Sequence, residues 1–414
     1  MAISISSRPE KTKGTYTSLW IAANNPVVFE FTTSGSPIDE GVQVALFEAD
    51  GFTRIVEFDP IPFPSSNTIQ VDFSAFLQSE LDNSDTSLTS QVNADNLQTS
   101  QFKVFRVGFN NVNSSYTVDS TQYVALNNVK QAGDVYGANL ADYVMDYDDS
   151  TSTVNAKGKF LSTFQNPVLW WYSPSESVLS SNVTVFHPSL AWILPKEYEN
   201  ETDYKIESKY NLPVTGTVTR TITLSSAKGL RFANYVTSVP TSDSIYTHST
   251  FTTSILDSND QEIIEKITFE VRRACNNPVA IKWKDKLGSW QVWVFEGDAN
   301  RGHNVESADS VGLPFNDIET LTRTSKTLRK TEIPTLSVSA DNLTKDQVLG
   351  LSGISVSPNV LLCTNDFQNV AGQDADNWVS INVLDSSVIL YNERLSRYRI
   401  AFDFELIELF TINN

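Results

Sequence analysis

The chain has 414 residues, a formal net charge of −19 and an isoelectric point of about 4.6. Its length suggests roughly two to four domains, and its charge argues against non-specific nucleic-acid binding by the whole molecule. The sequence has two cysteines, too few for a disulfide framework.

The N-terminus lacks the basic and apolar regions of a signal peptide, and no apolar run approaches the roughly 20 residues that a membrane helix needs. We therefore expect a protein that is made and folded in a cytoplasm and has no membrane partner. Charged residues make up 19% of the chain, and much of the remaining polar surface is Ser, Thr, Asn and Gln. That composition is typical of solvated strand faces and loops.

Residues 1–16 predict an extended N-terminal arm, because Arg8, Lys11 and Lys13 are accompanied by few apolar side chains. Alternating apolar residues then predict strands over 18–22, 27–31, 42–47, 55–58 and 102–109. Residues 71–81 predict a short helix with Asp72 as its N-cap. Its apolar face consists of Phe73, Phe76, Leu77 and Leu81.

A run of aspartates, residues 142–149, precedes a Ser/Thr stretch. Its spacing does not match an EF-hand loop, so we interpret it as a solvated acidic linker and place a domain boundary at residue 150. In the segment that follows, Trp170, Trp171 and Tyr172 predict an aromatic core or contact strand.

Residues 275–297 predict a β-hairpin. Val279, Ile281 and Trp283 alternate with other residues, and a turn follows over 285–289. The second strand has Trp290, Val292 and Val294 on one face, and Trp293 and Phe295 on the other. Large apolar residues on both faces indicate a strand that is covered on both sides. We expect Trp283 and Trp290 in the core, and Trp293 in a contact between modules or subunits.

The opening Asn-Pro-Val of this hairpin also occurs at residues 25–27 and 166–168, each time with a large apolar residue two positions and an aromatic residue four positions after the valine. Since proline is tolerated at the start of a strand, we expect related β-modules that begin with this motif, although chance recurrence explains it too. The sequence thus predicts a mainly β fold of antiparallel β-sandwich-type domains with a few short helices. Its predicted parts are the arm 1–16 and the modules 17–150, 151–271 and 272–414.

In the last module, residues 298–317 predict a charged loop, and 321–339 allow either a strand or a helix. Four cations without an intervening acid lie in this second segment: Arg323, Lys326, Arg329 and Lys330. They are either a docking strip for an acidic neighbour or a solvated edge that prevents unwanted strand pairing. Thr344 and Gln347 predict a capping box at the start of a short helix that stops at Gly350. Residues 399–409 predict a final strand, with Ile400, Phe402, Phe404 and Leu406 on one face.

The sequence contains no nucleophile elbow, dinucleotide fingerprint or phosphate loop, and its three histidines are scattered. We therefore expect no catalytic residue, no cofactor and no metal, although a glycosidase pair among 49 acidic residues is not recognisable from sequence.

The segment Cys275–Pro278 through Ile281–Trp283 and Leu287–Glu296 resembles a recurrent segment in virion proteins of tailed phages that infect Bacteroidetes, including the crAss-like phages. The Asn-Pro-Val strand at 25–27, the helix at 71–81, the helix start at 343–348 and the final aromatic strand fit the same pattern. The resemblance covers about half of the chain and its motifs are structural. It implies a β-sandwich-rich component of the tail, collar or neck ring, and no catalytic residue.

We therefore expect a non-enzymatic virion protein, made in the bacterial host, that forms a homo-oligomeric ring and bridges tail, neck or portal proteins. We expect neither a membrane partner nor direct nucleic-acid binding. The alternative is a glycan- or receptor-binding module, in which Trp170, Trp171, Trp290 or Trp293 would stack on sugars. The residues expected at subunit contacts are Trp170, Trp171, Trp293, Phe295, Arg323, Lys326, Arg329 and Lys330.

Overall fold

The structure is a computed structural model of the whole chain. It describes residues 3–9, 18–34, 41–63, 67–81, 102–111, 114–128, 140, 143–148, 151, 153–164, 166–172, 184–186, 188–193, 203–212, 216–225, 230–233, 250–274, 278–296, 299–312, 325–363, 378–384, 397–406 and 409–410.

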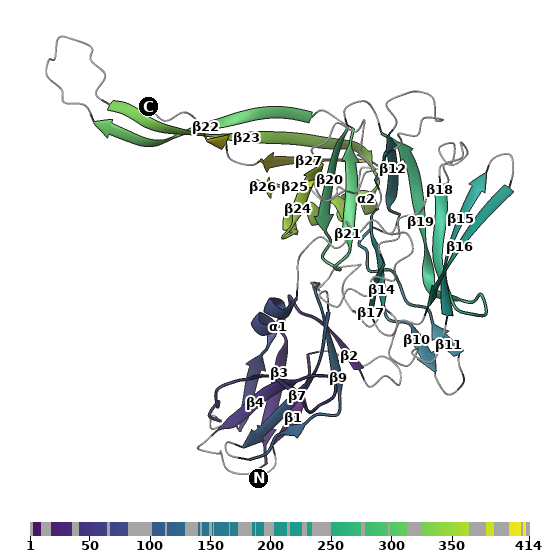
Figure 1. Cartoon of the computed structure of the whole chain (residues 1–414), viewed down its shortest axis with the longest axis vertical. Helices are drawn as coiled ribbons and strands as arrows, with labels where there is room; N and C mark the ends of the chain where they lie inside the picture. The colour runs from purple at the N-terminus through teal and green to yellow at the C-terminus, as the bar shows by residue number, and fades with distance from the viewer. Residues whose placement is uncertain are drawn as a thin grey trace. The chain divides into compact units, whose positions relative to one another are not determined.

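The protein is mainly β, with several antiparallel sheets and a few short helices, which confirms the predicted fold class (Figure 1). The chain passes repeatedly between two compact units. Unit 1 contains residues 1–167, 188–271 and 285–290; unit 2 contains residues 168–187, 272–284 and 291–414. The modules drawn from the sequence follow chain order and remain a prediction.

The first part of unit 1 is a β-sandwich. One sheet has the order β1-β3-β6 and the other β2-β9-β7-β4-β5, with the short β8 beside β7. All the pairings between these strands are antiparallel except β2 with β9, which is parallel. The strands are β1 Ile3–Ser7, β2 Ser18–Ala22, β3 Val28–Thr33, β4 Val42–Phe47, β5 Arg54–Glu57, β6 Thr68–Asp72, β7 Phe102–Asn111, β8 Thr117–Val118 and β9 Gln122–Leu126.

The sandwich core is formed by the inward-facing residues of both sheets. Phe29 is fully buried and packs against Phe73 and Tyr123, with ring centroids 5.4 and 4.9 Å apart. The strand alternation seen in the sequence therefore corresponds to real burial, since β3 alternates between half-buried and buried residues. Gly108 of β7 lies directly beneath the ring of Phe47, where a Cβ atom would collide with the ring.

The helix predicted over 71–81 is α1, Ser74–Glu80, and Phe73, Leu77 and Leu81 are buried as expected. The N-cap position falls on Phe73 rather than on Asp72. Asp72 is the last residue of β6, and its carboxylate accepts hydrogen bonds from the N–H groups of Val27 and Ser74 at 3.0 and 2.9 Å. The aspartate thus joins the helix start to the Asn-Pro-Val strand.

The beginning of the predicted N-terminal arm is an edge strand. β1 pairs with β3, and its Ile3 and Ile5 pack against the sandwich core. Arg8 donates hydrogen bonds to the hydroxyl of Tyr123 at 2.9 Å and to Asp119 at 3.0 Å. Ile3, Ile5 and the paired Arg8 thus attach this segment to the sandwich, whereas composition alone predicted an arm.

The second part of unit 1 begins with the acidic segment, which is a hairpin strand rather than a linker. β10, Asp146–Asp148, pairs with β11, Thr153–Ala156, and the backbone of such a pair is fixed by its ladder. Asp142 and Asp149 lie outside the described residues.

The same part of unit 1 has a sheet with the order β19-β18-β15-β16 and a pair β14-β17. These strands are β14 Leu190–Ile193, β15 Asp203–Leu212, β16 Gly216–Ser225, β17 Leu230–Ala233, β18 Thr250–Leu256 and β19 Glu262–Arg273.

Unit 2 contains a sheet with the order β21-β20-β24-β25, a sheet with the order β22-β23-β27-β26 in which β28 also pairs with β23, and the pair β12-β13. Its elements are β12 Val168–Tyr172, β13 Thr184–Phe186, β20 Val279–Lys284, β21 Trp290–Phe295, β22 Ala299–Gly312, β23 Ser325–Leu343, α2 Lys345–Leu351, α3 Gly353–Val356, β24 Val360–Cys363, β25 Trp378–Ser380, β26 Asn382–Val383, β27 Tyr398–Glu405 and β28 Leu409–Phe410.

The predicted hairpin of residues 275–297 is β20 followed by β21. Gly288 has a φ of 95°, as the turn requires, and Asp285 donates its N–H to the carbonyl of Ser289 at 2.7 Å. Both strands are buried at every position. This confirms the expectation for β21 and corrects the one-sided burial predicted for β20, where even Lys282 and Lys284 are covered.

Thr344 and Gln347 form the predicted capping box of α2. Thr344 donates its N–H to the Gln347 side chain at 2.9 Å and accepts the N–H of Gln347 at 3.3 Å. The predicted stop at Gly350 is wrong, because α2 continues to Leu351 and α3 follows almost at once. Gly350 is buried, and helical packing outweighs its low helix propensity.

Candidate interaction site

The longest strands of the chain are β22 and β23, of 14 and 19 residues, and they form one antiparallel ribbon. The register runs from Ala299 opposite Val338 to Gly312 opposite Ser325. The charged loop predicted over 298–317 is therefore a strand as far as Gly312. Of the two alternatives for 321–339, the strand is the correct one. We name this pair of strands the ribbon.

Only part of the ribbon belongs to a broader sheet, namely residues 331–343 of β23 and the residues of β22 that face them. β27 pairs with β23 over Thr335–Leu343, and β28 pairs with it at Thr331 and Glu332. In the described part of the chain, residues 325–330 of β23 pair with β22 alone. Figure 1 shows β22 and β23 continuing together beyond β27. We name residues 306–312 and 325–330 the distal ribbon.

The distal ribbon carries opposite charges on its two strands. Residues 306–312 include Glu306 and Asp309 and no cation, whereas 325–330 include Lys326, Arg329 and Lys330 and no acid. The register places Asp309 opposite Arg329. Three of the four predicted docking cations thus lie in one short stretch of β23; the fourth, Arg323, lies outside the described residues.

A two-stranded ribbon that packs against nothing else has low stability. It has two edges with unpaired backbone groups, and an isolated hairpin is at best marginally stable in water. The described side chains of the nearer part of β22, residues 299–305, are exposed except at Gly302. These features are typical of an element that is completed by another chain.

The predicted aromatic contact residues are buried within unit 2. Trp170, Trp293 and Phe295 are each exposed by 2% or less, and Trp171 by 5%. Trp170 and Trp293 pack edge to face with ring centroids 5.3 Å apart, and Phe295 packs against Phe402 at 6.0 Å. The structure thus brings together Trp170 and Trp293, which the sequence placed in different modules, and assignment of these residues to a subunit contact remains a prediction.

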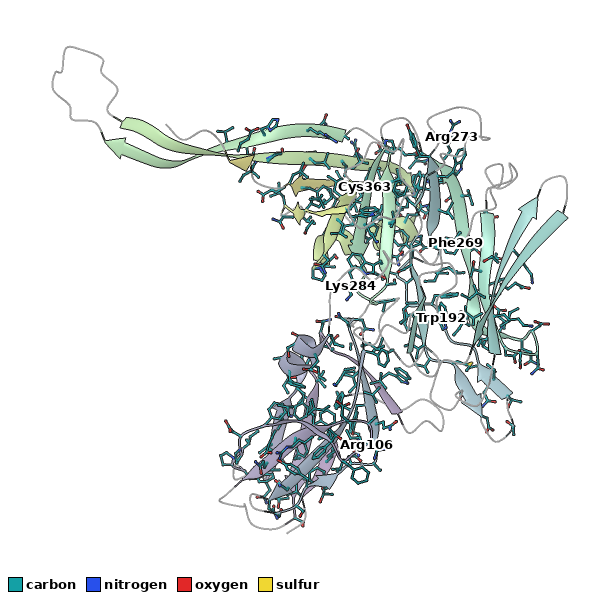
Figure 2. All side chains as sticks on the ribbon, viewed as in Figure 1. Arg106, Trp192, Phe269, Arg273, Lys284 and Cys363 are labelled. Atoms are coloured by element: carbon teal, nitrogen blue, oxygen red, sulfur yellow. The ribbon has the colours of Figure 1, made fainter. Side chains whose placement is uncertain are left out.

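Two arginines lie over tryptophan rings of the aromatic strand β12. The guanidinium of Arg272 lies 5.6 Å from the ring centroid of Trp170, and that of Arg273 lies 5.3 Å from Trp171. Figure 2 labels Arg273, which is exposed to solvent. These distances are within the range of cation–π contacts, so the arginines screen the indole rings from water.

All eight tryptophans are described, and seven of them are less than 9% exposed. Trp378, the eighth, is half-buried, and Lys282 lies 5.4 Å from its ring centroid. The four tryptophans named for sugar stacking, Trp170, Trp171, Trp290 and Trp293, therefore have no open ring face in this structure, and the alternative function stays a prediction. Trp283 and Trp290 are buried as expected, and Trp293 is buried equally.

Sequence reasoning missed Phe52, which among the described residues is the most exposed large apolar side chain, 90% exposed at the tip of the β4–β5 hairpin. The turn that holds it is well ordered by hydrogen bonds: Asp50 accepts the N–H groups of Phe52 and Thr53 at 2.8 and 3.0 Å. These bonds hold the pKa of Asp50 below its usual range. The Asp-Gly sequence signals such a turn, but no pattern in the sequence distinguishes an exposed phenylalanine from a buried one.

A second missed residue is Asp285, which is 2% exposed in unit 1. Its carboxylate accepts hydrogen bonds from the N–H and hydroxyl of Thr163 at 2.8 and 2.9 Å. Burial raises the pKa of Asp285 to about 6, against the lowering effect of these hydrogen bonds. Because the two residues are 122 positions apart, no local motif reveals the pair.

Among the described residues, no group of three or more His, Cys, Asp or Glu side chains is arranged to hold a metal ion. His303 is exposed and forms a 2.6 Å contact with Glu332 across the ribbon, whereas His187, His248 and Cys275 lie outside the described residues. In the part of the chain that is described, the helices are too short to cross a bilayer.

Within the described residues, the geometry defines a mainly β protein with buried aromatic cores and a long ribbon in which residues 325–330 of β23 pair with β22 alone. No protein-family model matches the chain, and no curated protein matches it in sequence.

Proposed function

We propose that the chain is a non-enzymatic structural component of a tailed bacteriophage virion, located in the tail or collar. It assembles as a ring of identical subunits and bridges neighbouring tail, neck or portal proteins. The single observation that carries this proposal is the distal ribbon, in which residues 325–330 of β23 pair with β22 alone among the described residues. Assembly proteins use such extensions to reach a neighbour, since the backbone of an open edge offers many hydrogen bonds at once.

The resemblance of the 275–297 hairpin to virion segments supplies the class of particle, and the multi-sheet β fold is compatible with it. The burial of the tryptophans supports a structural role over glycan binding, since rings that pack in a core cannot stack on sugars. The cations of β23 supply a docking strip within a strongly negative protein.

Antibody labelling tests the virion location. Antibodies raised against the purified chain are applied to virions of the phage that encodes it, and bound gold particles are located by electron microscopy. We expect label at one site on the tail or collar, and peptides of the chain in the digested particles. Particles that contain neither label nor peptides would contradict the proposal.

A further inference from the structure

We propose that the tip of the β20–β21 hairpin is a pH-sensitive latch of unit 1, closed while Asp285 is protonated and released when its carboxyl group ionises. We name residues 285–290 the hairpin tip. The inference goes beyond the proposed function and does not depend on it. It concerns how this one segment is held and which change in the solution frees it.

The hairpin tip is buried although it contains a turn. The residues on either side of it belong to unit 2, whereas residues 285–290 belong to unit 1. Turns usually run over the protein surface, where water satisfies their polar backbone groups. Asp285, Leu287 and Ser289 are nevertheless each exposed by 2% or less. The polar groups of the tip therefore need partners within the protein.

Two residues of unit 1 supply these polar partners. The N–H and the hydroxyl of Thr163 lie 2.8 and 2.9 Å from the two carboxyl oxygens of Asp285. Ser189 donates its N–H to the carbonyl of Trp290 at 2.8 Å, and its hydroxyl accepts the N–H of Trp290 at 2.8 Å. Both ends of the tip are thus bonded to segments that are distant in sequence.

Leu287 is the apolar anchor between these two ends. It is 1% exposed and belongs to a cluster of buried side chains in unit 1 that includes Trp20, Tyr143, Leu161 and Ile193. The burial of an apolar side chain stabilises a contact in proportion to the area removed from water, without a change of charge. The pH dependence of the latch therefore comes from Asp285.

Burial favours the neutral form of Asp285. The hydroxyl of Thr163 can donate to a carboxylate or accept from a carboxyl group, so protonation costs no hydrogen bond there. Ionisation, in contrast, places a charge in a site that water does not reach. Burial raises the pKa of Asp285 to about 6, although the hydrogen bonds from Thr163 and the positive charge of the neighbouring Lys286 lower it.

Release of the tip would return the carboxyl group of Asp285 to water, where its pKa is 3.8. The closed latch therefore binds the proton more tightly than the released latch. By linkage, the closed state is most stable at low pH and loses stability as the pH rises through about 6.

Hydrogen exchange of the full chain tests the latch. The wild type and Asp285→Asn are labelled in deuterated buffer at a series of pH values from 4 to 7, and peptides from the hairpin tip and from β3 are followed by mass spectrometry. The rates are corrected for the intrinsic pH dependence of amide exchange. Circular dichroism establishes that both proteins are folded.

We expect the protection of the wild-type tip to fall by roughly 50-fold from pH 4 to pH 7, as pKa values of about 6 in the closed state and 3.8 in the released state require. At pH 7 the tip should exchange faster than β3, because it opens while the sandwich stays folded. Asp285→Asn should abolish the dependence on pH. The matched control Asp72→Asn changes another carboxylate that accepts two backbone N–H groups, and should leave the pH dependence of the tip intact.

Constant protection of the wild-type tip between pH 4 and pH 7 would overturn the proposal, whether or not the variant folds. A wild-type tip that exchanges at the rate of β3 at every pH would overturn it too, since the tip would then open only with the whole fold. A pH dependence that persists in Asp285→Asn would assign the effect to a different group and overturn the role of Asp285. These results leave the virion location intact, which the labelling of particles tests separately.

Discussion

At Asp285 the structure buries an ionisable group that the fold holds mainly by hydrogen bonds from Thr163. Its pKa rises from 3.8 to about 6 because burial penalises the charged form. The folded state therefore binds a proton more tightly than the unfolded state. The resulting stabilisation is complete below about pH 3.8 and is lost as the pH rises through about 6.

We predict that Asp285→Asn flattens the pH dependence of stability in this window. An amide keeps an acceptor for Thr163 and does not ionise, so the difference in unfolding free energy between variant and wild type should grow by up to about 3 kcal/mol from pH 4 to pH 7. Urea unfolding at a series of pH values measures it. Parallel curves for the two proteins across the window would show that Asp285 does not titrate there.

Phe29 and Phe52 provide a matched comparison of a buried and an exposed phenylalanine in the same sandwich. Phe29 is fully buried, so Phe29→Ala should lower the unfolding free energy by about 3–5 kcal/mol. Phe52 is 90% exposed, and Phe52→Ala should change it by less than about 0.5 kcal/mol. Equal losses in dilute protein would mean that the Phe52 ring is covered in solution.

The burial of a residue could be predicted from the sequence where apolar residues alternate along a strand, and not elsewhere. Period-2 alternation located Ile400, Phe402 and Phe404 on one buried face of β27, as the structure confirms. The burial of Lys282 and Lys284 was not predictable, because it depends on elements that are distant in sequence.

At the scale of elements, the capping box of α2 offers a direct test of local sequence chemistry. Thr344→Ala removes the acceptor for the Gln347 N–H and should cost about 1 kcal/mol of stability. Thr344→Ser keeps the hydroxyl and should retain most of it. Chemical unfolding of the three proteins measures both changes. An alanine variant as stable as the wild type would show that tertiary packing alone holds α2.

The cationic strand of the ribbon should make assembly depend on salt. Replacing Arg323, Lys326 and Lys330 together by glutamate should leave the free energy of unfolding within about 1 kcal/mol and abolish assembly at low salt, because single exposed pairs contribute little but act together. Sedimentation over a salt series should also show wild-type assembly weakening as exposed charges are screened. Unchanged assembly of a folded variant would leave the cations as a solvated edge.

The hairpin β20–β21 was predictable because apolar alternation, a turn with glycine and a second alternating run follow one another in sequence. The ribbon was not, since residues 298–317 are polar and show no alternation on which a strand prediction depends. A strand without a buried face is recognised only through its partner, here β23. The candidate site was therefore half predicted: its cations were identified, and its acidic strand was interpreted as a loop.

At the scale of the whole molecule, the account depends on several negatively charged copies coming together through a small, complementary surface. Subunits that each carry −19 repel one another at long range, and the repulsion is screened over about 10 Å at 0.1 M salt. Contacts that form under these conditions require opposite charges on the two surfaces that meet.

The most direct test of this account is the mass and symmetry of the purified protein, alone and after incubation with phage lysate. Native mass spectrometry gives the number of copies, and class averages from electron microscopy give the symmetry. We predict a closed oligomer with rotational symmetry, formed alone or on a partner from the lysate. A chain that stays monomeric in both conditions and in the particle would contradict the account.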